Sequence, residues 1–121
     1  MATLANTVLD NGLSTLTTNG TRIDICTTEP TTYAEATSTY SLGNGTVTTT
    51  SPTDRIGGGR EVVVGAVSDA PVTATGTAAF YSVTNGSDTL YATGSLSTTQ
   101  SVANGNTFSL GSFSIGIPDP A

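Results

Sequence analysis

The stretch SVTNGSDTLY, from Ser82 to Tyr91, places strand-forming residues on both sides of a short polar cluster. An Asn-Gly pair between two such runs predicts a β-hairpin, because both residues tolerate the positive φ of a type I′ turn. The same cluster, Asn85-Gly86-Ser87, also fits the acceptor pattern for N-glycosylation, as do Asn19-Gly20-Thr21 and Asn44-Gly45-Thr46. Whether these Asn-Gly pairs simply form turns or also carry glycans depends on whether the chain is exported.

The N-terminal sequence MATLANTVLD has no basic residue before its apolar part, so it does not resemble a secretory signal. No window approaches the run of apolar residues that a membrane-spanning helix needs. We therefore expect the chain to be made and kept in the cytoplasm. The three glycosylation patterns are then expected to stay unused, and the Asn-Gly pairs within them are expected to mark turns.

Strand patterns continue outward from the hairpin. Its two arms are PVTATGTAAFYSV (71–83) and TLYATGSL (89–96), and TRIDICTTE (21–29) places Ile23 and Ile25 on the face opposite Arg22 and Asp24. REVVVGAV (60–67) has valines on both faces, which predicts a central strand or one lying against a partner.

The apolar parity changes within NTFSLGSFSIGIP (106–118). Phe108 and Leu110 are even-numbered, whereas Phe113, Ile115 and Ile117 are odd-numbered. Side chains alternate between faces with period two, so this change predicts a β-bulge or kink at Gly111-Ser112.

The remaining segments complete a single domain over residues 1–121. Residues 4–16 predict a helix that either ends near Asn11-Gly12 or continues through Gly12. A short strand is expected around 39–42, a flexible loop or arm at 51–59, and an extended tail at 118–121. The predicted fold is all-β: a small antiparallel sandwich or barrel of six to seven strands, with a short N-terminal helix as an optional addition.

Charge and cysteine content exclude several classes of protein. The net charge is −6, there is no Lys, and the three basic residues are scattered arginines, so we expect no nucleic-acid binding and no basic membrane-surface helix. The single cysteine, Cys26, is predicted to be a small buried hydrophobic residue. A reactive thiol is the alternative, with Arg22 as the nearby cation.

Candidate chemistry is sparse. Histidine is absent, which removes the commonest general base, and the nine acidic residues show no spacing that selects a catalytic pair. NGSDT and SPTD offer oxygen ligands for calcium, but turn formation explains the same residues. GGGR (57–60) lacks the ending of a phosphate-binding loop and is read as a hinge. We therefore expect no enzyme activity, no catalytic residue, no cofactor and no metal site.

Large apolar residues are few for a chain of this length, so burial gives thin support against chain entropy. We infer that self-association or docking supplies part of the stability. The candidate contacts lie in a docking segment at residues 1–18 and near the C-terminus. They are Leu4, Val8, Leu9, Leu13, Phe113, Ile115 and Ile117. For both groups the alternative is ordinary core within the chain.

Two stretches, RIDICTTEPTTYAEATSTYSLG (22–43) and FSLGSFSIGIPDPA (108–121), resemble small virion proteins of tailed bacteriophages, among them head decoration (cement) proteins. The resemblance implies a non-enzymatic β-rich subunit on the outer surface of the capsid. It also implies a homotrimer that binds the major capsid protein.

The alternative is a tail or fibre component, with a host-glycan binding module as one form of it. The aromatic residues available for such a module are Tyr33, Tyr40, Tyr81 and Tyr91.

Overall fold

The computed structural model describes residues 5–118, and strands make up 49% of it. In chain order its elements are α1 (Asn6–Asn19), β1 (Arg22–Cys26), the π-helical segment η1 (Glu35–Thr39), β2 (Ser41–Thr46), β3 (Thr53–Asp54), β4 (Arg60–Val64), β5 (Val67–Pro71), β6 (Gly76–Thr84), β7 (Leu90–Val102), β8 (Thr107–Leu110) and β9 (Phe113–Ile117). The all-β class and the N-terminal helix are confirmed. There are nine strands in the described residues, more than the six or seven expected, and they do not form a closed barrel.

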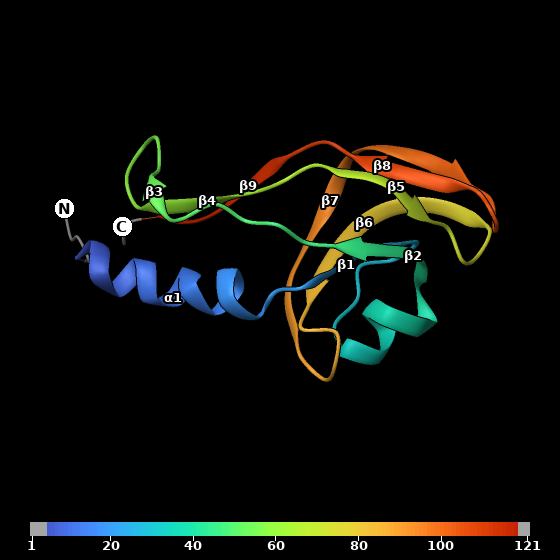
Figure 1. Ribbon diagram of the computed structural model, residues 1–121, viewed down its shortest axis with the longest axis horizontal. Coiled ribbons are helices and arrows are strands. Elements are labelled where there is room, and N and C mark those ends of the chain that lie inside the picture. Colours follow the sequence, from blue (N-terminus) through green and yellow to red (C-terminus); the bar gives the residue numbers. More distant parts are fainter. Residues whose placement is uncertain (1–4, 119–121) are drawn as a thin grey trace.

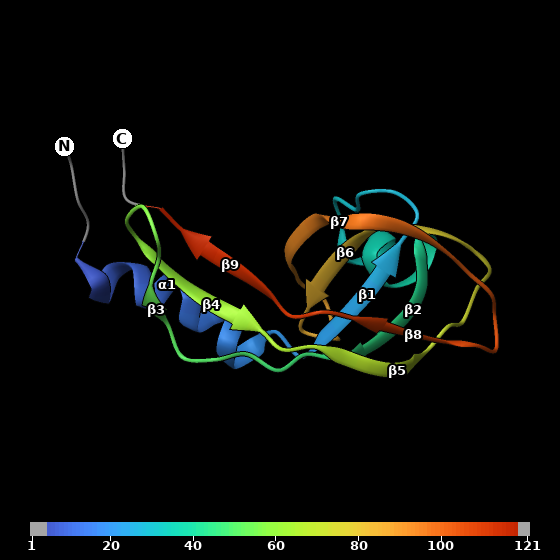
Figure 2. The same cartoon turned by 90° about the horizontal axis from the view of Figure 1, so that it is seen from above.

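The molecule is elongated and has two parts (Figure 1). The part that we name the arm consists of α1 and the antiparallel sheet β3-β4-β9. The part that we name the body consists of the four-stranded sheet β2-β1-β6-β7, the pair β5-β8 and η1. Figure 2 shows that β4 leads from the arm into β5 of the body, and that β8 returns into β9.

The arm is a helix packed on one face of a sheet. The helix continues through Gly12 to Asn19, so the longer of the two predicted helices is the one observed. No side chain caps its N-terminus, so its stability depends on packing. Leu9, Leu13 and Leu16 form its buried stripe and face the sheet.

The β-hairpin predicted from Ser82–Tyr91 is confirmed as β6 and β7, the longest strand pair of the fold. Its turn is not the predicted type I′ turn. Gly86 has a positive φ of 75°, but Asn85 does not, and the loop spans the residues between Thr84 and Leu90. The Asn85 side chain instead accepts three hydrogen bonds from the loop backbone.

The turn predicted at Asn44-Gly45 is wrong, because both residues lie inside β2 and pair with Asp24 and Ile23 of β1. The physical reason is close packing of the two sheets. A methyl group at Gly45 would lie 2.9 Å from Val67 Cγ1, so only glycine lets β5 approach this closely. The pair Asn19-Gly20 marks the end of α1, where Gly20 has an ordinary negative φ.

The break predicted at Gly111-Ser112 is confirmed in position. It is a change of sheet and not a bulge within one strand, since β8 pairs with β5 and β9 pairs with β4. The chain therefore passes from the body to the arm between β8 and β9.

The small sheet covers only part of the large one. Val67, Ala70 and Phe108 of β5-β8 pack against the glycines of β2 at one edge of the large sheet. The inner surface of β6 and β7 lies beyond this cover, and Tyr81 and Leu96 remain only partly buried there. The sandwich therefore has four strands in one layer and two in the other.

Candidate functional site

The N-terminal residues predicted to bind a partner lie in different environments. Leu9 and Leu13 are 2% and 3% exposed and belong to the chain's own core, so they present no surface in this structure. Val8 is 55% exposed on the side of α1 away from that stripe. Leu4 lies outside the described residues.

The C-terminal candidates lie together on β9. The register pairs Val62 with Ile115 and Val64 with Phe113, so all four side chains share the helix-covered face of the arm sheet. The two valines are fully buried, whereas Phe113, Ile115 and Ile117 are half-buried. Phe113, Ile115 and Ile117 thus contribute to the core of the arm, while part of each side chain remains at the surface.

An ion-pair cluster joins α1 to the β3-β4 hairpin. Arg60 Nε lies 2.8 Å from Asp10 Oδ1, and Arg60 Nη1 lies 2.7 Å from Asp54 Oδ1. These hydrogen bonds to Asp10 and Asp54 raise the pKa of Arg60. The segment 51–59, expected to be a flexible loop or arm, contains β3 and a turn in which Arg55 hydrogen-bonds to the glycine backbone.

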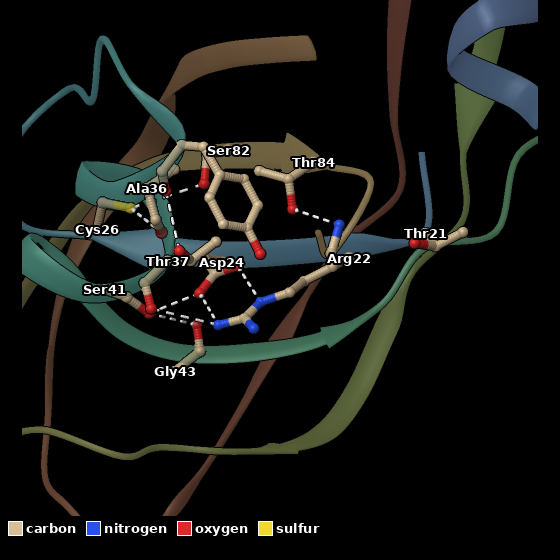
Figure 3. A network of polar contacts seen from close by, with 12 residues as sticks. Thr21, Arg22, Asp24, Cys26, Ala36, Thr37, Ser41, Gly43, Ser82 and Thr84 are labelled. Atoms are coloured by element: carbon tan, nitrogen blue, oxygen red, sulfur yellow. Dashed lines mark hydrogen bonds and ion pairs between the residues drawn. The ribbon is translucent and has the colours of Figure 1, made fainter. Parts of the chain in front are cut away.

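A second polar network fills the face of β1 that η1 covers (Figure 3). The Asp24 carboxylate is fully buried and accepts two hydrogen bonds from Arg22 and one from Ser41 Oγ at 2.6 Å. The hydrogen bond to Asp24 raises the pKa of Arg22. Among the described residues no buried side-chain nitrogen or oxygen lacks a hydrogen-bond partner, and the bonds to Thr37 O and from Ser41 link η1 and β2 to β1.

Cys26 lies at the inner end of the same face. Its thiol is fully buried, contacts Ala36 O and lies 3.8 Å from Ser82 Oγ. Burial raises its pKa to about 11. The prediction of a small buried hydrophobic residue is confirmed, and Arg22 is engaged by Asp24 and does not activate the thiol.

The calcium candidate at NGSDT is a self-contained turn. Asp88 Oδ1 accepts hydrogen bonds from Asn85 Nδ2 and Thr89 Oγ1, and these bonds lower the pKa of Asp88. Within residues 5–118, no group of three or more metal-ligating side chains converges. Over the same residues, no helix is long and apolar enough to cross a bilayer.

One hollow lies where the small sheet leaves the large one uncovered. It has a volume of about 590 Å³ and lies between residues 95–100 of β7 and residues 109–114 at the β8-β9 crossing, with Tyr81 on its floor. A second hollow of about 550 Å³ shares Gln100 and Ser109 with the first and continues beside β8. We name the two hollows together the groove.

Both walls of the groove are formed by strands at the edge of a sheet. In the part of the chain that the structure describes, β7 pairs only with β6, β8 only with β5, and β9 only with β4. β7 and β9 carry no charged residue, although charged side chains commonly protect such edges. The groove was not predicted from sequence. The parity change at residues 108–117 and the uncharged run of β7 were the available signals.

The four tyrosines form no exposed platform for a sugar. All four are partly buried, and the Tyr81 ring packs at a tilt of 47° against the Phe113 ring, with the ring centroids 4.5 Å apart. Burial also raises the pKa of Tyr81. The glycan-binding alternative thus receives no support from their positions.

Comparison of the chain with protein-family models, curated proteins and solved structures gives no match.

Proposed function

We propose that this protein is a non-enzymatic structural component of a tailed-phage virion, which decorates and stabilises the outer capsid surface. In this proposal it binds the major capsid protein and copies of itself. The homotrimer implied by the resemblance remains part of the proposal.

The observation that carries the proposal is the pair of open, uncharged edge strands, β7 and β9, beside an incompletely covered sheet. Unpaired strand edges are templates for pairing with another chain, so a protein that stays alone usually protects them. Here Val8 is exposed, and Ile115 and Ile117 are half-buried near the edge of β9. These groups suit a surface that another protein covers.

The charged groups support a binding role more than a catalytic one. Asp10, Asp24 and Asp54 are engaged in ion pairs, and Glu35 and Asp88 accept hydrogen bonds from neighbouring side chains. The net charge of −6 is compatible with a position outside a DNA-filled shell.

The test compares phage particles that contain the protein with particles that lack it. The proposal expects the depleted particles to release DNA at a lower temperature, and expects added purified protein to restore the original temperature. Depleted particles that withstand heating as well as complete ones would count against the proposal.

A further inference from the structure

The groove lies where a third strand, added beside β8 in the small sheet, would cover β6 and β7. The large sheet has four strands and the small sheet has two, so β8 has no neighbour above β6 and β7 in the described residues. The open edge of β8 and its continuation into β9 runs along the groove over residues 106–114. At about 3.3 Å per residue, an extended segment of roughly ten residues would span this length.

The residues that line the groove indicate which side chains a bound segment can place in it. The large apolar lining residues are Tyr81, Leu96, Leu110 and Phe113 in the first hollow and Phe108 and Val102 in the second. The remaining lining residues are small or uncharged polar residues. No charged side chain lines either hollow among the residues described, in a chain whose net charge is −6. A basic segment would find its complement elsewhere on this surface, so the groove matches an uncharged segment.

In a second copy of this chain, each of the nine strands within residues 5–118 already pairs with a neighbour. Such a strand has at most one free edge and would bring its own sheet into the space above β6 and β7. A single extended segment of a different protein needs no such space, so we take it as the occupant, and self-association through the groove is an outcome that the experiment distinguishes.

We propose that the groove binds an extended, uncharged segment of a partner protein, which adds as a strand to the open edge of β8 and β9. Main-chain hydrogen bonds provide the affinity, and alternate side chains of the segment enter the two hollows. This inference rests on the proposed function in one respect only, namely that the protein works by binding another protein.

The experiment uses the purified full chain and a displayed library of random ten-residue peptides. The proposal expects enriched peptides to lack charged residues, to carry apolar residues at alternate positions, and to have no proline in their central part. N-methylation of alternate backbone nitrogens in an enriched peptide should abolish binding on one parity and spare it on the other.

Two variants place a charge in the groove from opposite walls. Thr98→Arg changes the β7 wall and Ser112→Arg changes the β8-β9 wall, and both side chains are exposed. Each should weaken peptide binding by about tenfold or more, because the bound segment offers no counter-charge. Ser87→Arg makes the same change in the exposed β6-β7 loop and should bind as the wild type does. Thermal melting of each variant verifies that it is folded.

The outcomes separate the inference from the proposed function. Failure of the library to enrich peptides, enrichment of charged peptides, or unchanged binding by both groove variants would overturn the strand-addition proposal. Self-association that the two groove variants abolish would also overturn it, since the occupant would then be a second copy. The binding assay needs no virion, so a chain that is absent from virions but binds such peptides refutes only the proposed function.

Discussion

Arg22 and Asp24 form a two-point ion pair on one face of β1, with Nε–Oδ1 and Nη2–Oδ2 distances of 2.8 and 2.9 Å. They are two residues apart, so their side chains lie on the same face of the strand. The Asp24 side chain is fully buried, whereas that of Arg22 is 29% exposed. The residues on this face of β1 are polar, yet η1 covers the face. Arg22 and Asp24 neutralise each other's charge in this covered position.

We expect Asp24→Ala to lower the free energy of unfolding by about 2–3 kcal/mol, because it leaves Arg22 and Ser41 without their acceptor in a covered site. Chemical denaturation measures this loss. Asp54→Ala is the matched control, since Asp54 is 86% exposed and water screens its pair with Arg60. Equal losses in the two variants would show that the Asp24 network has no special structural role.

The raised pKa of Cys26 predicts a loss of stability at alkaline pH. The thiol has a pKa of about 11 in the folded chain against an ordinary value of 9.0, so the unfolded chain releases its proton first. The contribution is complete below pH 9 and is lost as the pH rises through 11, by about 3 kcal/mol in total. Comparison of wild type with Cys26→Ala across this range isolates the effect, because the tyrosines titrate in both. Identical slopes for the two proteins would contradict the prediction.

The Asn85 side chain organises the hairpin loop from within. Its Oδ1 accepts hydrogen bonds from the backbone nitrogens of Ser87, Asp88 and Thr89 at 2.9–3.0 Å. We expect Asn85→Ala to destabilise the fold by about 1 kcal/mol, with faster amide exchange at the ends of β6 and β7. Asn104→Ala provides the comparison in the Asn-Gly turn between β7 and β8 and should change stability less. A larger effect at Asn104 would refute this account of the loop.

Gly12 within α1 and Gly20 directly after it predict opposite effects on substitution by alanine. A methyl group at Gly12 would lie 3.2 Å from the flexible end of Ile117, whereas one at Gly20 would lie 2.6 Å from the backbone oxygen of Leu16. We expect Gly12→Ala to stabilise the protein by about 0.5–1 kcal/mol through helix propensity, since Ile117 can shift slightly. Gly20→Ala should destabilise it by about 1–3 kcal/mol. Thermal unfolding of both variants measures these changes. Destabilisation by Gly12→Ala would contradict the prediction and would mean that Ile117 is rigidly held.

The sequence predicted those features that depend on local pattern. The hairpin around Asn85 and the strand containing Ile23 follow from alternation and turn residues that lie close together in the chain. The break at Gly111-Ser112 follows from the parity of the apolar residues on either side. Each of these signals lies within a short stretch of sequence, so the feature that it predicts is also found in the folded protein.

Features that depend on packing between distant segments were not predictable in the same way. Asn44-Gly45 has the composition of a turn, and only the approach of Val67 in β5 explains why glycine is needed inside a strand. The groove depends on how far β5-β8 extends across β6-β7, which no single stretch encodes. Leu9 and Leu13 were placed on α1 by periodicity, but whether their stripe faces the chain itself or a partner depends on the position of β4.

The proposal that this protein decorates a capsid is tested most directly by its copy number in purified virions. Quantitative mass spectrometry, with the major capsid protein as the internal reference, gives that number. A shell component is expected in hundreds of copies per particle. A count of a few dozen or fewer, or its absence from the particle, would contradict the proposal.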